Sequence, residues 1–150
     1  MSGFFGPIAL SLMLAVGALH CSKGTKSMSS TTKPAESLPA LSTELGLSFP
    51  ASTRLIGVRR EAGIDDAVQA KLEMSSADVP AFLASTPLDV SAMRSGTRGF
   101  LGADVDFWDP HKASALKTGQ GMLPAGKALN IGVDESRGTI AVVYVMRHGT

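Results

Sequence analysis

Residues 140–146 are Ile-Ala-Val-Val-Tyr-Val-Met, a run that is apolar at nearly every position and rich in β-branched side chains. A strand with one solvent-exposed face alternates apolar with polar residues, whereas a strand buried on both faces is continuously apolar. The stretch therefore predicts a central strand that is covered on both sides, around which the rest of a sheet is built.

Two hairpins are predicted around this strand. The first ends in it: Leu129, Ile131 and Val133 lead into the loop of residues 134–138, where Gly138 suits a left-handed turn position. The second lies earlier in the chain, where residues 53–61 are strand-like. Its other strand alternates buried with solvent-exposed positions, as shown by Val68, Ala70, Leu72 and Met74 between Gln69, Lys71 and Glu73.

The sequence contains fewer helix signals than strand signals. Residues 75–78 predict a helix start, followed by a buried stripe of Val79, Phe82 and Leu83 and a stop at Thr86-Pro87. Asp109-Pro110 predicts the cap and first turn of a short helix that extends to about Leu116. The fold class is therefore α+β: a small, mainly antiparallel sheet of about four strands, in two hairpins, backed by one or two short helices.

The N-terminal segment has a different character. Residues 4–21 form an uncharged apolar run that ends at Cys21, the chain's single cysteine, and residues 22–40 are rich in Ser, Thr, Lys and Pro. The apolar run has the length of a signal peptide and is shorter than the roughly 20 residues of a membrane-spanning helix. Three regions are predicted: a signal peptide at 1–20, an anchor site and flexible linker at 21–44, and one domain at 45–150.

The segment Ala18-Leu19-His20-Cys21 resembles the lipobox of bacterial lipoproteins, in which the cysteine is diacylated and becomes the new N-terminus. The resemblance implies that Cys21 is lipidated and that the acyl chains hold the protein on a membrane of the bacterial cell envelope, at the outer membrane or its periplasmic face. A single cysteine cannot form an internal disulfide, which agrees with such a role. Cleavage after Ala18 would instead give a secreted protein, and an uncleaved segment would remain as an anchor.

Charge excludes one class of partner. The 14 Lys and Arg residues nearly balance the 13 Asp and Glu residues, so the formal net charge is +1. Arg59-Arg60 is the only adjacent basic pair, and Glu61 follows it directly. Nucleic-acid-binding domains usually show a basic excess or stripe. Nucleic acid is therefore not an expected partner.

One short segment concentrates reactive side chains, and it supports a rival to a purely structural role. Carboxylates near an imidazole can hold a divalent ion or serve acid–base catalysis, and the segment contains Asp104, Asp106, Asp109 and His111. A small metal-dependent hydrolase is therefore the alternative function. The favoured interpretation makes Asp109 a helix cap and His111 an ordinary helix residue. No catalytic, metal-binding or cofactor-binding residue is assigned, and no cofactor is expected.

Three weaker patterns receive structural interpretations. Asp65-Asp66 suits a turn, and the glycine-rich residues 96–102 suit a loop rather than a phosphate site. Arg147-His148-Gly149 resembles the signature of histidine phosphatases, but His111 would have to be the second catalytic histidine, and the strand order does not fit that family. These residues are expected to end a strand.

Together these features predict an envelope-anchored lipoprotein with a non-catalytic binding or structural domain. Segments of the domain also resemble small exported bacterial domains that have no assigned function; these segments are residues 63–68, 71–72, 130–134 and 142–144. The membrane is the expected partner of the acyl anchor, and an envelope protein is a further partner of unknown identity. The exposed edge of a hairpin strand could also support subunit assembly.

Overall fold

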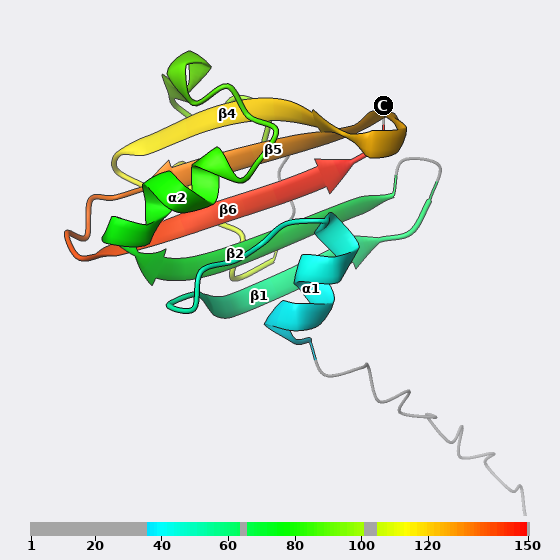
Figure 1. Ribbon diagram of the computed structural model, residues 1–150, viewed down its shortest axis with the longest axis horizontal. Coiled ribbons are helices and arrows are strands. Elements are labelled where there is room, and N and C mark those ends of the chain that lie inside the picture. The colour runs from blue at the N-terminus through cyan, green and yellow to red at the C-terminus, as the bar shows by residue number, and fades with distance from the viewer. Residues whose placement is uncertain (1–35, 64–65, 101–104, 150) are drawn as a thin grey trace, which may run out of the picture. The chain divides into compact units, whose positions relative to one another are not determined.

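The computed structural model describes residues 36–63, 66–100 and 105–149. The predicted signal peptide, Cys21 and the first part of the predicted linker lie outside these residues. Within them the chain forms one six-stranded sheet in which the neighbouring strands are antiparallel (Figure 1). The strand order is β1-β2-β6-β5-β4-β3, with bounds β1 Arg54–Glu61, β2 Ala67–Ser75, β3 Arg94–Ser95, β4 Leu116–Leu123, β5 Lys127–Asp134 and β6 Ile140–His148.

Strand β6 lies between β2 and β5, as the continuous apolar run predicted. All residues from Ala141 to Met146 are buried, so the strand is covered on both faces. Both predicted hairpins are present, and Gly138 adopts φ +77° in the β5–β6 loop. The α+β class and the antiparallel sheet are confirmed. The estimate of about four strands is wrong, because β3 and β4 were not predicted.

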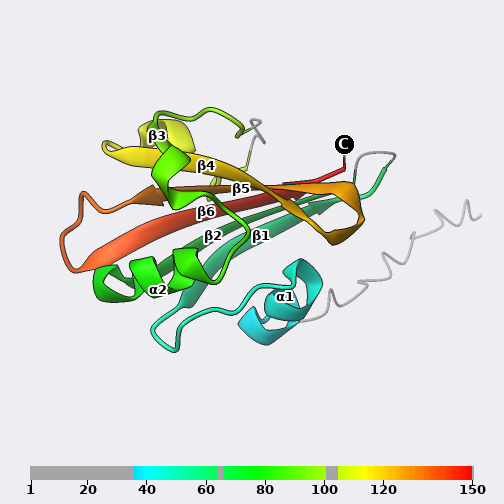
Figure 2. The same cartoon turned by 45° about the horizontal axis from the view of Figure 1, so that its top comes forward.

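The two α-helices of the described residues, α1 (Leu38–Leu45) and α2 (Val79–Ala84), cover the same face of the sheet (Figures 1 and 2). Helix α2 buries Val79, Phe82 and Leu83, as predicted, after a short 3-10 turn at Ser76–Asp78. With the inward side chains of β2, β5 and β6 these residues form the larger hydrophobic core. Burial of this apolar surface is the main driving force for folding.

Helix α1 corrects the predicted boundary between linker and domain. The domain was expected to begin at residue 45, but α1 already packs Leu41, which is fully buried, into the core. Ser37 caps the N-terminus of the helix, and Gly46 ends it at φ +66°. These are ordinary helix boundary signals. They were overlooked because the helix has only eight residues and follows a Ser- and Thr-rich stretch.

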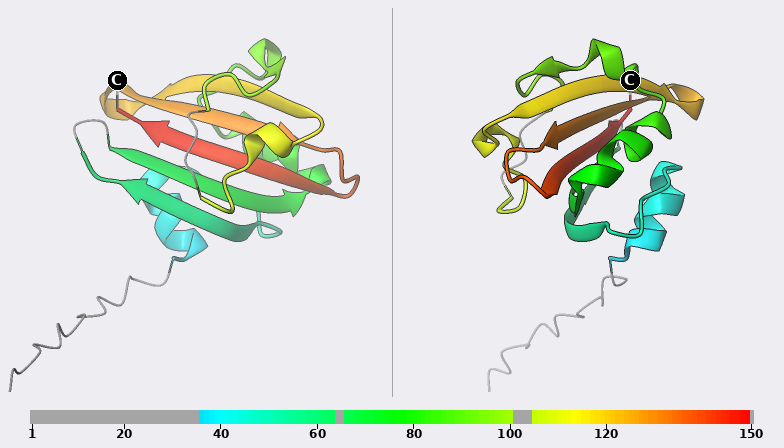
Figure 3. Two further views of the ribbon diagram at one scale, coloured as in Figure 1. Left: turned by 180° about the vertical axis from the view of Figure 1, so that it is seen from behind. Right: turned by 60° about the vertical axis from the view of Figure 1, so that its left-hand side comes forward.

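The opposite face of the sheet is crossed by residues 105–115, which precede β4 and form the covering segment (Figure 3, left). Trp108, from this segment, packs edge-on against Tyr144 of β6 with ring centroids 5.6 Å apart, and a second hydrophobic cluster forms around them. The predicted helix from Asp109 to Leu116 is wrong. Only one 3-10 turn forms, at Pro110–Lys112, and β4 begins at Leu116.

This covering segment also corrects the prediction for β2. Its polar side was expected to face solvent, but Gln69 is 5% exposed and Lys71 is 9% exposed. A buried amine needs a partner, because removing a charge from water is costly unless it is paired. The partner of Lys71 comes from the covering segment and lies at the centre of the candidate site.

Candidate functional site

The residues of the predicted acidic cluster do not converge. Asp104 lies outside the described residues, and Asp106 and His111 are exposed. Asp109 alone turns toward the sheet. In the described part of the chain, no group of three or more His, Cys, Asp or Glu side chains is placed to hold a metal ion.

Asp109 bridges two strands of the sheet. One of its oxygens, Oδ1, accepts hydrogen bonds from Lys71 Nζ of β2 at 2.5 Å and from Tyr144 Oη of β6 at 2.8 Å. The Lys71 ammonium also lies 5.4 Å from the centroid of the Tyr144 ring, within the range of a cation–π contact. These three side chains form the Lys71–Asp109–Tyr144 cluster. Asp109 makes no side-chain cap to the 3-10 turn that follows it, so its predicted capping role is wrong.

The cluster fixes the protonation state of two of its groups. Burial by itself would raise the pKa of Asp109, but the hydrogen bonds from Lys71 and Tyr144 outweigh burial and hold that pKa below its ordinary value. Burial, together with the hydrogen bond to Asp109, raises the pKa of the Tyr144 phenol far above its ordinary value. At neutral pH Asp109 is therefore ionised and Tyr144 is protonated.

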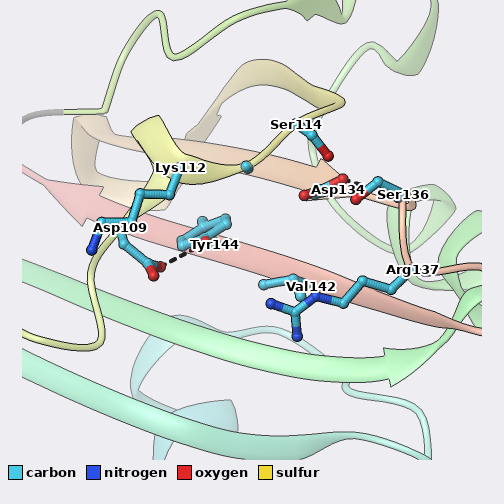
Figure 4. A pocket seen from close by; sticks show the side chains of 9 residues that line it. Asp109, Lys112, Ser114, Asp134, Ser136, Arg137, Val142 and Tyr144 are labelled. Carbon is cyan, nitrogen blue, oxygen red and sulfur yellow. Dashed lines mark hydrogen bonds between the residues drawn. The ribbon is translucent and has the colours of Figure 1, made fainter.

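A small polar pocket of about 120 Å³ lies beside the cluster (Figure 4). The Asp109 carboxylate meets the Tyr144 hydroxyl at one end, and Ser114, Asp134 and Ser136 gather at the other. Asp134 is 5% exposed, and its Oδ1 accepts a hydrogen bond from the Ser136 backbone amide at 3.0 Å. Asp134 was not among the candidate site residues predicted from the sequence. Its position at the end of a strand before a hairpin loop is the usual signal for an Asx turn.

Asp134 is ionised for a reason similar to that of Asp109. Burial would raise the pKa of its carboxyl group, but hydrogen bonds from the backbone and hydroxyl of Ser136, and from the backbone of Ser114 and Ala115, together lower it. Both carboxylates that line the pocket are thus held by donors of the protein itself. Chemically, the arrangement fastens the covering segment and the β5–β6 loop to the sheet.

A second network of polar side chains lies at the opposite end of the sheet and is centred on Asp66 and Arg147. Asp66 accepts hydrogen bonds from Lys127 Nζ at 2.8 Å through both carboxylate oxygens, and from Arg147 at 3.2 Å. Arg147 also donates to the backbone carbonyl of Glu44 in α1 at 2.9 Å. His148 lies beside the buried Asn130, with its Nε2 3.1 Å from the amide nitrogen. The Arg147-His148 pair therefore belongs to contacts within the fold. Asp65 lies outside the described residues.

The single tyrosine of the chain allows a direct test of the cluster. Because burial and Asp109 raise its pKa, Tyr144 should remain protonated in the folded protein as the pH passes its ordinary value of about 10. The unfolded chain ionises there, so the stability contributed by the protonated phenol is present below about pH 10 and is lost as the pH rises further. Tyrosinate absorbance should rise together with the loss of tertiary structure. A rise near pH 10 in a protein that is still folded would contradict the assignment.

Comparison of the chain with protein family models, with curated proteins and with solved structures finds no match. None of the helices in the described part of the chain is long and apolar enough to cross a membrane.

Proposed function

We propose that this protein is a bacterial envelope lipoprotein, anchored through Cys21, whose domain serves as a non-catalytic binding or structural module. The order of segments supports the anchor: an apolar leader, a single cysteine at its end, and a polar stretch before the domain. The acyl chains on Cys21 would hold the molecule at the membrane surface, and the polar stretch would separate the domain from that surface.

The observation that carries the non-catalytic role is the position of Asp109. A metal-dependent hydrolase built on the acidic segment would need this carboxylate to face a ligand. Instead, Asp109 lies between Lys71 and Tyr144 and pairs with both. Its charge is compensated by Lys71, and its low pKa opposes the protonation that a general acid needs.

The two polar networks support a scaffold role. The cluster joins residues 71, 109 and 144, and the second network joins residues 44, 66, 127 and 147. Each network connects segments that are far apart in the chain and brings them to neighbouring strands. The Lys71–Asp109 pair is largely shielded from water, and ion pairs of that kind fix geometry more than they add net stability. A rigid sheet with both faces covered is a suitable support for a binding surface on its edges and loops.

The anchor is tested by metabolic labelling with radioactive palmitate in a bacterial host. The unaltered chain should incorporate the label, and Cys21→Ser should abolish incorporation, because the thiol is the acceptor of the lipid. Ser22→Ala is the matched control, since it changes the neighbouring residue and keeps the thiol. Equal labelling of Cys21→Ser, or a mature N-terminus at another residue, would refute the anchor.

A further inference from the structure

The sheet has two edges, and they differ in chemistry. Edge strand β1 carries Arg54, Arg59, Arg60 and Glu61, and its pairing with β2 shifts register between Leu55 and Gly57. Charged side chains and bulges on an edge strand hinder the addition of another strand. This edge is therefore protected.

The other edge is covered for only part of its length. Strand β3 has two residues, and it pairs with Lys117 and Thr118 of β4. In Figure 1 the part of β4 nearest its arrowhead runs along the rim of the sheet with no ribbon beyond it. As far as the described residues go, residues 119–123 of β4 thus form an open edge.

The hydrogen bonds of β3 show which backbone groups face outward. Gly96 N donates to the carbonyl of Leu116 at 3.0 Å, and Arg94 pairs with Thr118. Because backbone direction alternates with a period of two, the amide and carbonyl of Gln120 and Met122 also point outward. Among residues 36–63, 66–100 and 105–149, no backbone hydrogen bond reaches these outward groups.

The side chains of this edge favour pairing with another strand. Residues 118–123 are Thr-Gly-Gln-Gly-Met-Leu and carry no charge. Gln120 is exposed, and Met122 is 54% exposed, which makes it one of the few large apolar side chains that face solvent in the described chain. An uncharged edge strand with an exposed apolar residue is a template for strand addition.

We propose that two copies of this protein pair through the open edges of β4, antiparallel about a two-fold axis at Gly121. In an antiparallel ladder, outward-facing residues of one strand must bond with outward-facing residues of the other. Thr118 is already paired with β3, and residue 124 is a proline without an amide hydrogen. The register that uses the open groups of both copies therefore places Gln120 opposite the partner copy's Met122.

This register explains why a second copy is the occupant. A two-fold pair brings the same edge of two copies together, so an edge rich in one charge would place like charges close to one another. Strand β1 carries three arginines and would do so in many alignments. No charge lies between Thr118 and Leu123, and each exposed Met122 packs beside the Gln120 amide of the other copy. The contact is short, so the dimer should be weak in solution. Shared attachment to a membrane would raise its effective concentration.

Disulfide trapping tests the register. A Cys21→Ser background removes the native thiol, and the Gln120→Cys and Met122→Cys chains are then prepared separately in it. Directly opposed residues have Cα atoms about 5.5 Å apart, which suits a disulfide, whereas the diagonal pairs of like residues are about 7–8 Å apart. Mild oxidation of the mixture should therefore give the mixed 120–122 disulfide several-fold more than either homodimer. Ile140→Cys, also half-exposed but at the start of β6, is the control and should cross-link only at the collisional level.

Analytical ultracentrifugation at protein concentrations up to about 1 mM tests whether the two copies associate. The Cys21→Ser chain should show a reversible dimer that Met122→Pro weakens at least several-fold, because proline removes an amide used only between copies. Gln120→Ser keeps the amide and should dimerise like its parent. A chain that is monomeric throughout, or a dimer unaffected by Met122→Pro, would overturn the proposal, as would equal yields of the three disulfides. The test does not depend on whether Cys21 is acylated.

Discussion

Replacing Lys71 with methionine is expected to lower the free energy of unfolding by about 3 kcal/mol. Methionine matches the length of the lysine stem and keeps the apolar contacts, so the change removes mainly the ammonium group. The Asp109 carboxylate, whose side chain is 23% exposed, then lies against the sheet without its counter-charge. Removing one member of a shielded ion pair costs more than removing both, because the remaining charge stays poorly solvated.

A double-mutant cycle measured by urea unfolding separates this cause from a general loss of packing. Lys71→Met combined with Asp109→Leu should recover a large part of the stability, since no charge is then left uncompensated. Lys117→Met is the matched control, because Lys117 is exposed on β4 and should change stability by less than about 0.5 kcal/mol. A loss below 1 kcal/mol for Lys71→Met would show that the cluster is solvated and would reopen Asp109 as a ligand-facing group.

The elements that could be predicted from the sequence are those with a clear period. Strand β6 and the two hairpins have such patterns, and α2 has a capped start and a proline stop. The polar face of β2, which was predicted to be exposed, shows the limit of predicting burial from a periodic pattern. Gln69, Lys71 and Glu73 alternate with apolar residues as an exposed face would. Gln69 and Lys71 are nevertheless buried, and Lys71 pairs with Asp109 of the covering segment, which is far away in the chain.

The sequence predicted one residue of the candidate site and none of its partners. Asp109 was singled out because acidic residues gather around it, but its partners are 38 and 35 residues away in the chain, and no local pattern links them to it. Its function as a bridge between strands follows from the sheet order, which places Lys71 of β2 opposite Tyr144 of β6. A motif of reactive side chains therefore predicts where charge collects, and the tertiary pairing decides what the charge does.

Strand β4 was not predicted because it contains Gly119 and Gly121, which are poor strand formers. At both glycines the chain that connects α2 to β3 crosses the strand closely. A Cβ atom at Gly121 would lie 2.5 Å from the backbone carbonyl oxygen of Pro87. Gly121→Ala should therefore lower the free energy of unfolding by about 2–3 kcal/mol, because backbone must move to accommodate the methyl group.

Gly119→Ala supplies the matched comparison on the same strand and the same face. Its Cβ would lie 2.9 Å from Met93 and 3.0 Å from Leu88, but both contacts are with flexible side chains that can rotate away. The expected loss is about 1 kcal/mol or less, partly offset by the gain from replacing glycine within a strand. Thermal unfolding of the two variants should therefore separate them clearly. Equal losses would mean that the backbone between α2 and β3 moves as easily as a side chain. The close backbone crossing would then not be the reason for glycine at position 121.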